Sequence, residues 1–497
     1  MTPQFAVVVP TVGRPSLHRL LAELEGSAGP RPADVIVVDD RAATEPALSL
    51  ECRLPVRVLR SGGRGPAAAR NTGWRATTAD WICFLDDDVV PQPNWFAALA
   101  DDLAKAEVQA AAGSQAQIEV PRVGGRRATD DERRTQRLAD AQWITADMAF
   151  RRDVLVAVGG FDDRFPRAYR EDSDVALRIT RAGNTIVRGA RRCTHPVAQA
   201  TLMSSVRAQV GNRDNALLRR KHGRRWRAQI GEGRGRLPLH AVTTATGVVA
   251  ALGALTGRRQ AARLAAALWA LLTAEFAARR FWAGPHTAAE AGRMVLTSAL
   301  IPPVAVAHRA AGEWTFRGAR PDPPLAVLFD RDDTLIEDGP YLNDPAGVRP
   351  LPGAVDALNR LRRRGLLLAV VTNQSGVARG LISPDQLRAV NAAVEAALGP
   401  FDSWHVCLHD DTDGCRCRKP APGMVVDAAA ALGVHPSRCV LMGDTGGDVE
   451  AALAAGADAV LVPTRRTLRP EINRARAGAR VASSIDEAVS LVLKDCR

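Results

Sequence analysis

Two aspartates stand two residues apart in the segment Asp330–Thr334, which directly follows the apolar run Ala326–Phe329. Such a run predicts a buried parallel strand, and ligands of open α/β sheets bind at the carboxyl ends of these strands. Carboxylates at that edge can bind a metal ion, attack an electrophile or transfer a proton. A turn or a helix cap is the alternative role for an isolated pair of this kind.

Further groups suited to phosphate chemistry follow later apolar runs. Thr372 and Asn373 follow Leu366–Val371, Lys419 follows a cysteine cluster, and two more aspartates follow Cys439–Met442. A phosphoryl group in transfer needs its charge neutralised and its position fixed. We expect Mg²⁺, which prefers oxygen ligands, among these carboxylates. The alternative role for Asp448, the last of them, is to orient Lys419. The candidate carboxylates are Asp330, Asp332, Asp444 and Asp448.

This series of residues resembles the haloacid-dehalogenase superfamily of phosphatases. The resemblance implies that Asp330 attacks phosphorus and that Asp332 acts as general acid and base. It also implies that Thr372 and Lys419 stabilise the group in transfer. The chain departs from the pattern at Asp333, where the family usually has glycine.

Three cysteines and a histidine lie within eleven residues, as Cys407, His409, Cys415 and Cys417. Three thiolates and one imidazole complete a tetrahedral Zn²⁺ site and leave no position open for a substrate. We therefore predict a structural zinc ion. The spacing lacks the second histidine of a nucleic-acid-binding finger.

This loop and the segment Arg418–Met424 resemble the subfamily that contains D-glycero-D-manno-heptose 1,7-bisphosphate phosphatase and the histidinol-phosphate phosphatases. The likeness extends to Thr372–Gly376 and Asp338–Leu342. It implies that Asn373, Arg418 and Lys419 hold the substrate phosphate and that the segment around Tyr341 shapes the pocket. A heptose-like bisphosphate is the favoured substrate, and histidinol phosphate is the alternative.

A second set of acidic residues follows apolar runs in the first two hundred residues. Asp39 and Asp40 follow Val35–Val38, and Asp86, Asp87 and Asp88 follow Trp81–Leu85. Carboxylates at neighbouring strand ends suit a nucleotide and a divalent cation. We expect the first pair to bind the base or ribose, Asp86 and Asp88 to hold Mg²⁺ or Mn²⁺ against a diphosphate, and Asp87 to lie at the same donor site.

The segments Gly65–Gly73, Gly159–Asp162 and Glu171–Asp174, taken with these aspartates, resemble the GT-A fold of family-2 glycosyltransferases over residues 5–195. The resemblance implies an inverting transferase that uses a nucleotide sugar, with Asp172 as catalytic base and Glu171 as the second candidate. Arg70 either contacts the diphosphate or packs in the core. We also expect Trp143 and Met148–Arg151 on the acceptor side.

Apolar runs alternate with helical stretches from residue 5 and again after residue 324, which predicts two doubly wound α/β domains. We expect a GT-A domain over 1–206, a basic helical connector over 207–320 and a phosphatase domain over 321–497. The apolar runs of the connector fall short of the roughly 20 residues of a membrane-spanning helix. Helices packed on the first domain, or interfacial helices attracted to anionic lipid, are therefore expected. These runs are Ala241–Leu255, Leu264–Ala278 and Met294–Ala307.

The bulk composition identifies no partner by itself. The 497 residues carry a formal net charge of +12, nearly all of it arginine spread over the chain, so we expect no nucleic-acid partner. The remaining cysteines are scattered, which suits a reducing compartment. The N-terminus lacks a signal-peptide pattern, so the predicted location is the cytoplasm, with peripheral contact at the inner face of the plasma membrane.

The sequence therefore predicts a bifunctional enzyme. One head transfers a sugar from a nucleotide sugar to an unknown acceptor, and the other removes phosphate from a sugar phosphate. The alternative from another class is a chain in which one head is catalytically silent and the basic connector tethers the other to a membrane or a nucleic acid.

Overall fold

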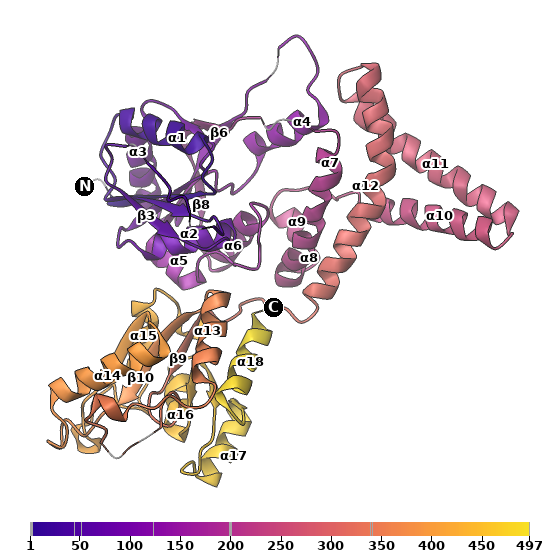
Figure 1. Cartoon of the computed structure of the whole chain (residues 1–497). Coiled ribbons are helices and arrows are strands. Elements are labelled where there is room, and N and C mark those ends of the chain that lie inside the picture. Colours follow the sequence, from indigo (N-terminus) through magenta and orange to yellow (C-terminus); the bar gives the residue numbers. More distant parts are fainter. Residues whose placement is uncertain are drawn as a thin grey trace. The chain divides into compact units, whose positions relative to one another are not determined.

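The computed structural model describes residues 3–43, 45–50, 52–122, 124–197, 201–337, 339 and 341–496. The chain divides into two compact units, Met1–Leu155 with Gly160–Arg317 and Val156–Gly159 with Gly318–Arg497. Each unit is an α/β fold (Figure 1), which confirms the predicted fold class. The connector expected over 207–320 falls almost entirely within the first unit.

The first unit is built on an eight-stranded sheet in the order β3-β2-β1-β4-β7-β6-β8-β5. The four strands predicted from apolar runs form its parallel half. All seven residues of β1 are buried, because helices cover both faces of this half. Its elements are β1 (Phe5–Thr11), α1 (Ser16–Gly26), β2 (Asp34–Asp39), β3 (Val56–Arg60), α2 (Pro66–Arg75), β4 (Trp81–Leu85) and α3 (Trp95–Val108).

The other half of this sheet was not predicted. Strand β7 runs antiparallel to both β4 and β6, so the sheet is mixed and not purely doubly wound. Met148, Ala149 and Phe150 of β7 are fully buried, so these three do not line an open acceptor side, whereas Arg151 is 42% exposed and its place there stays a prediction. The elements are β5 (Val90–Pro91), β6 (Gly113–Glu119), α4 (Asp130–Gln136), β7 (Asp147–Arg151), α5 (Arg152–Val158), α6 (Glu171–Arg181) and β8 (Ile186–Thr194).

A buried arginine holds the mixed half together. Arg191 of β8 has no exposed surface, and its Nε lies 2.8 Å from Asp147 Oδ1 of β7. Its Nη1 lies 3.1 Å from Asp102 Oδ2 of α3, and the Trp95 indole donates to Asp147 Oδ2 at 2.7 Å. Both carboxylates are thereby paired, which a buried charge requires.

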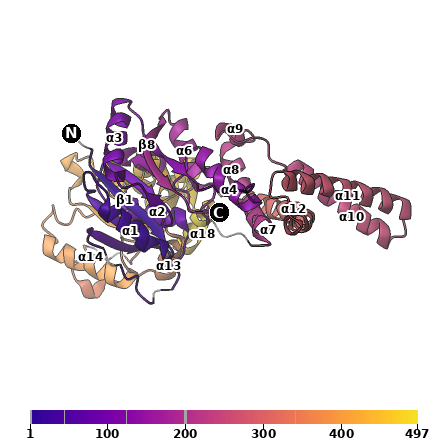
Figure 2. The same ribbon diagram turned by 90° about the horizontal axis from the view of Figure 1, so that it is seen from above.

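Helices complete the first unit. The short helices α7 (Ser204–Arg207), α8 (Gly211–His222) and α9 (Trp226–Gln229) lead into three long ones. These are α10 (Leu237–Leu255), α11 (Arg259–Trp282) and α12 (Ala288–Thr315), and α10 and α11 form a hairpin that extends from α12 (Figures 1 and 2).

The prediction that the connector runs are too short for membrane-spanning helices was wrong. In the described residues all three long helices are long and apolar enough to cross a membrane. Glu275 and the pair Pro302-Pro303 lie inside α11 and α12 instead of ending them. Helices α10 and α11 are also mostly exposed, with 17% and 11% of their apolar windows buried, so packing on the first domain does not account for them.

The second unit is a six-stranded parallel sheet in the order β11-β10-β9-β12-β13-β14, and the strands predicted after residue 324 are confirmed. Strand β9 is central and wholly buried. The strands are β9 (Ala326–Phe329), β10 (Leu367–Asn373), β11 (Ser403–Cys407), β12 (Cys439–Gly443), β13 (Asp458–Leu461) and β14 (Arg480–Val481). The helices are α13 (Ala354–Arg364), α14 (Pro384–Leu398), α15 (Gly423–Ala431), α16 (Gly446–Ala454), α17 (Arg469–Gly478) and α18 (Ile485–Asp495).

Replacing Arg191 with methionine leaves Asp147 and Asp102 buried without their cation. We expect the free energy of unfolding of the first unit to fall by about 3–5 kcal/mol. Arg192→Met removes a half-exposed pair with Glu119 and should cost at most about 1 kcal/mol. Urea unfolding followed by tryptophan fluorescence measures both variants, and equal losses would contradict the structural role of Arg191.

Candidate active sites

Three carboxylates gather at the carboxyl edge of the second sheet. Asp330 follows β9 and Asp444 follows β12, and these strands are neighbours paired through Phe329 and Met442. Asp448 lies in the first turn of α16, where Thr445 forms a capping box with it. Ligand oxygens of the three aspartates lie within 4.8 Å of one another. The sequence-predicted carboxylates therefore meet, except for Asp332.

One buried lysine faces this cluster. The Nζ atom of Lys419 lies 2.8 Å from Asp330 Oδ1 and 2.5 Å from Asp448 Oδ1, and it donates to the Val371 carbonyl at 2.9 Å. Burial alone would lower the pKa of Lys419, but the two aspartates raise it above its ordinary value. The lysine is thus a fixed positive charge at the end of β10.

The charge of the cluster is not balanced by Lys419 alone. Burial, then the neighbouring carboxylates, raise the pKa of Asp444 to about 8. Burial also raises the pKa of Asp330 to about 7, although Lys419 opposes it. Crowded carboxylate oxygens that resist ionisation fit a hard divalent cation such as Mg²⁺, which would stabilise their charged forms.

Asp332 lies outside the cluster of three. Arg331 Nε lies 2.9 Å from Asp332 Oδ1, and Gln374 Nε2 donates to Asp332 Oδ2 at 2.7 Å. Gln374 also donates to Thr372 Oγ1 at 3.0 Å, so these two predicted catalytic side chains share one partner. The arrangement positions Asp332 for proton transfer more readily than for metal binding.

The predicted phosphate-binding residues differ in their surroundings. The side-chain amide of Asn373 makes two hydrogen bonds to the main chain of Lys419. Its Nδ2 donates to the Lys419 carbonyl, and its Oδ1 accepts the Lys419 N–H, both at 3.1 Å. Arg418 instead donates from Nε to Asp411 Oδ1 at 2.6 Å, so its guanidinium lies against the cysteine loop. Asp333 adopts a φ of 52°, the left-handed region, which explains why glycine suits this position.

The pocket segment 338–342 is described only in part, because Asp338 and Pro340 lie outside the described residues. The hydroxyl of Tyr341 accepts a hydrogen bond from Arg379 Nη1 at 3.1 Å. Arg379 also donates to Asp410 Oδ2 at 2.7 Å and so connects this segment to the cysteine loop. Sequence reasoning missed Arg379, because one more arginine is no signal in an arginine-rich chain.

The predicted zinc ligands do meet. The Sγ atom of Cys417 lies 3.4 Å from Cys407 Sγ and Cys415 Sγ and 3.2 Å from His409 Nδ1. Tetrahedral Zn–S bonds of about 2.3 Å would place sulfur atoms about 3.8 Å apart, so the four side chains fit one ion. Cys407 is buried, Cys415 and Cys417 are half-buried, and His409 is exposed.

In the first unit, Arg70 connects Asp86, a predicted metal ligand of the transferase site, to Glu171, a candidate base. Its side chain is 1% exposed, and Nη2 lies 2.6 Å from Asp86 Oδ1 at the end of β4. Its Nη1 lies 2.9 Å from Glu171 Oε1 at the start of α6. Burial and the neighbouring Asp172 raise the pKa of Glu171 to about 8 although Arg70 opposes them.

The predicted donor-binding aspartates have different partners. Arg41 occupies both oxygens of Asp39, at 2.8 and 2.7 Å, so a base or ribose must displace it. Asp40 accepts the Gly65 N–H at 2.9 Å and fixes the start of α2. Asp87 is buried and accepts from the Thr11 hydroxyl at 2.6 Å, which gives it a structural role.

The candidate transferase metal ligands remain accessible. The side chains of Asp86 and Asp88 are 25% and 26% exposed, so both keep oxygen atoms open to a cation. They belong to neither of the clusters of three or more potential ligands found in the described residues. His195, which sequence reasoning did not single out, directly follows β8, and its Nε2 lies 3.9 Å from Asp88 Oδ1.

The two candidate bases lie at the N-terminus of α6. Glu171 is 2% exposed and paired with Arg70, whereas Asp172 is half-buried and accepts the N–H of the following Ser173 at 2.6 Å. Arg170 precedes them in a left-handed conformation and donates to Glu232 Oε2 at 2.9 Å. Trp143 is half-buried, and its main-chain N–H donates to Gln115 Oε1 at 2.6 Å.

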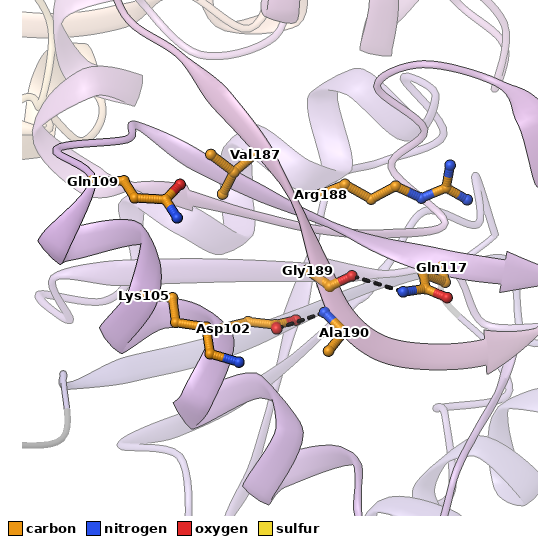
Figure 3. A pocket seen from close by; sticks show the side chains of 8 residues that line it. All are labelled: Asp102, Lys105, Gln109, Gln117, Val187, Arg188, Gly189 and Ala190. Carbon is orange, nitrogen blue, oxygen red and sulfur yellow. Dashed lines mark hydrogen bonds between the residues drawn. The ribbon is translucent and has the colours of Figure 1, made fainter.

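A separate cavity of about 280 Å³ lies between α3 and β8 and contains none of these candidates (Figure 3). Asp102 in its wall accepts the Ala190 N–H at 2.6 Å and also pairs with Arg191. Asp102 therefore serves the sheet, and we assign the cavity no catalytic role.

Comparison with known proteins gives each unit a family. Residues 6–157 match the family model of glycosyl transferase family 2, and residues 416–488 match that of HAD-hydrolase-like proteins. A D-glycero-beta-D-manno-heptose-1,7-bisphosphate 7-phosphatase of Pseudomonas putida is 38% identical over 143 residues, which are 28% of this chain and 82% of that relative. The Escherichia coli phosphatase of the same name is 32% identical over 162 residues, 30% of this chain and 85% of that relative.

A solved D,D-heptose 1,7-bisphosphate phosphatase from B. bronchiseptica, complexed with magnesium and phosphate, is 31% identical and covers 34% of this chain and 99% of its own, with a TM-score of 0.31. The identities and coverage of the curated relatives decide the assignment. Through its C-terminal unit the chain belongs to the heptose-bisphosphate phosphatase family of HAD-like hydrolases, and it joins this enzyme to an N-terminal family-2 glycosyltransferase.

Proposed function

We propose that the chain dephosphorylates a heptose-like sugar bisphosphate through an aspartyl-phosphate and, at its other head, transfers a sugar from a nucleotide sugar with inversion. The observation that supports this most strongly is the buried cluster of Asp330, Asp444 and Asp448 around Lys419. Fixed carboxylates and one fixed cation are what a phosphoryl group in transfer requires.

In the phosphatase reaction Asp330 attacks phosphorus, and the bond from phosphorus to the sugar oxygen breaks. Asp332, held by Arg331 and Gln374, gives its proton to the leaving sugar oxygen. It then accepts a proton from the water that hydrolyses the acyl-phosphate. Lys419 neutralises phosphoryl charge throughout, and Mg²⁺ between Asp330 and Asp444 would add positive charge there.

The proposed substrate rests on the relatives and on the fusion. Both curated relatives named above are heptose-bisphosphate 7-phosphatases, and this chain covers more than four fifths of each. A sugar-transferring partner on the same chain also favours a sugar phosphate over histidinol phosphate. The zinc ion is proposed to fix the loop that carries Arg418 and bonds Arg379, so that the pocket near Tyr341 keeps its shape.

In the transferase reaction Asp172 accepts the proton of the acceptor hydroxyl, whose oxygen attacks the anomeric carbon opposite the nucleotide. The bond to the nucleoside diphosphate breaks, which inverts the anomeric configuration. Arg70 lies between Asp86 and Glu171 and balances their charge. Mg²⁺ or Mn²⁺ at Asp86 and Asp88 would stabilise the departing diphosphate.

We place the enzyme in the cytoplasm, at the inner face of a membrane. All eight cysteines are free thiols, which supports a reducing compartment. The exposed apolar helices α10 and α11 support contact with lipid.

Asp330→Asn should lower phosphate release by at least about a thousandfold, because the amide cannot act as the nucleophile. Phosphate release is measured with heptose 1,7-bisphosphate, other sugar phosphates and histidinol phosphate. Asp356→Asn, an exposed change on α13, is the matched control, and sugar transfer should persist in both variants. Preference for histidinol phosphate, or loss of sugar transfer in a folded Asp330→Asn protein, would contradict the proposal.

Freshly purified protein should contain about one tightly held zinc ion per chain, measured by elemental analysis. Cys417→Ser removes a ligand and should abolish zinc retention and lower the melting temperature of the second unit. Cys52→Ser, a half-buried free thiol in the first unit, should change neither. Full stability without zinc would exclude a structural metal.

Asp172→Asn should lower the rate of sugar transfer by about 10²–10⁴-fold, because the amide cannot accept the proton. Asp153→Asn, whose side chain is 62% exposed, is the control. Release of nucleoside diphosphate from a panel of nucleotide sugars gives the rates. An active Asp172→Asn beside an inactive Glu171→Gln would assign the base to Glu171.

A further inference from the structure

The hairpin of α10 and α11 exposes many large apolar side chains. Less than a fifth of either apolar window is buried. A soluble monomer rarely exposes so large an apolar surface. The exposed large side chains are Leu239, Val242, Val248, Val249, Leu252, Leu255, Leu264, Leu268 and Leu271.

The threonine hydroxyls of α10 are satisfied within the helix. No charged residue lies between Arg236 and Arg258. The hydroxyls of Thr243 and Thr244 donate to carbonyls four residues earlier in α10, at 2.9 and 2.7 Å. Hydrocarbon offers no hydrogen bonds, so a segment inside it must satisfy its polar groups internally in this way.

Small residues bring the two helices close together. A Cβ on Gly247 would lie 3.1 Å from Trp269, and one on Gly253 would lie 3.1 Å from Ala262. Close contact at small residues is how helices associate in lipid, where no hydrophobic effect drives them together. The hairpin is therefore packed as a unit without help from the transferase sheet.

Charges lie at the two ends of the hairpin. Arg258 and Arg259 form its turn, and at its base Arg236 pairs with Glu275. The 19 residues of α10 span about 28 Å at 1.5 Å per residue, close to the hydrocarbon thickness of about 30 Å. Arginines at both ends can reach lipid headgroups, to which their charge is complementary.

We infer that the α10–α11 hairpin inserts into a lipid bilayer and holds the transferase head against the headgroups. A helix that only lies on a membrane has one apolar and one strongly charged face, whereas α10 is uncharged on every side. Insertion, and not surface adsorption, fits this pattern.

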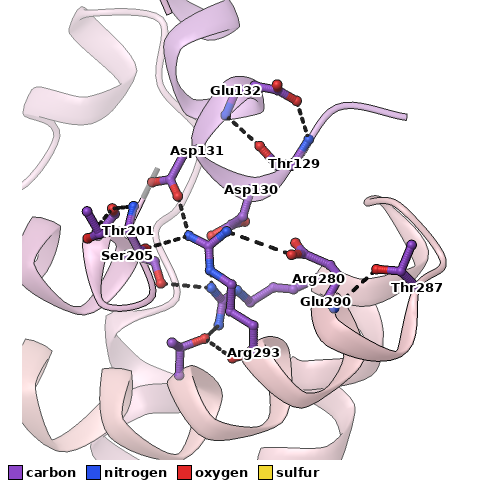
Figure 4. Close-up of polar contacts among 12 residues, drawn as sticks. Thr129, Asp130, Asp131, Glu132, Thr201, Ser205, Arg280, Thr287, Glu290 and Arg293 are labelled. Carbon is purple, nitrogen blue, oxygen red and sulfur yellow. Dashed lines mark hydrogen bonds and ion pairs between the residues drawn. The ribbon is translucent and has the colours of Figure 1, made fainter. Parts of the chain in front are cut away.

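A buried arginine of α11 and a half-buried arginine of α12 fix the hairpin base to the transferase (Figure 4). Arg280 of α11 donates to Asp130 of α4 at 2.8 Å and to Ser205 of α7 at 3.0 Å. Arg293 of α12 pairs with Asp131 of α4. Helix α4 lies in the connection between β6 and β7, so the segment that leads to Trp143 is attached to the hairpin base.

The candidate base is also linked to this region. Arg170, next to Glu171 and Asp172, donates to Glu232, and Leu237 at the start of α10 follows five positions after Glu232. Five residues span at most about 18 Å. That these links bring the acceptor side of the transferase close to the membrane rests on the proposed transferase function, whereas the insertion of the hairpin does not.

Flotation of the full chain with vesicles of phosphatidylcholine and phosphatidylglycerol tests the inference independently of catalysis. The protein should float with the vesicles in high salt. The double variant Val249→Arg with Leu271→Arg places charges on the middle of the hairpin and should reduce flotation by more than about tenfold. Val108→Arg with Leu468→Arg changes residues of similar type, 89% and 63% exposed elsewhere, and should float like the wild type.

The urea unfolding transition of the first unit should be unchanged in both double variants, which confirms that the unit carrying the hairpin folds. Lipids brominated in their acyl chains should quench the fluorescence of Trp269, and Trp269→Phe should lose that quenching. Release from vesicles by high salt, a lipid-free soluble monomer, or a soluble dimer formed through the hairpin would each overturn the inference.

Discussion

Both catalytic heads depend on one constraint, which is that negative charge collected at the carboxyl ends of parallel strands must be held by a buried cation. In the second unit this cation is Lys419, within 2.8 Å of Asp330 and 2.5 Å of Asp448. In the first unit it is Arg70, between Asp86 and Glu171. Neither cation neutralises all the carboxylates around it, and the remaining charge is available for a metal ion or a substrate.

The difference between the two cations fits the difference in chemistry. Lys419 presents a compact charge to carboxylates within one cluster, as a small phosphoryl group requires. The planar guanidinium of Arg70 reaches two separate groups at once, Asp86 at the end of β4 and Glu171 at the start of α6. Each head therefore carries its own electrostatic machinery within its own sheet.

The sequence predicted the parallel strands well, because buried strands are continuous apolar runs bounded by polar residues. Trp81–Leu85 and Ala326–Phe329 are identical to β4 and β9. It failed on β6, Gly113–Glu119, where polar side chains such as Gln115 lie in a mixed sheet with no apolar run to mark it. It also underestimated the length of α11, because the apolar run Leu264–Ala278 is shorter than the helix Arg259–Trp282.

Site residues that the sequence marks by a rare residue type or by close spacing do lie together in the structure, as Cys407 and His409 do. Asp332 stands apart from the carboxylate cluster, because Arg331 and Gln374 determine where it points and neither contact can be inferred from spacing.

The central claim is that Asp330 becomes phosphorylated. Rapid quenching during turnover with phosphate-labelled heptose bisphosphate, followed by peptide mass spectrometry, should find an acyl-phosphate on Asp330; phosphate release at full rate with no label on that residue would contradict the account.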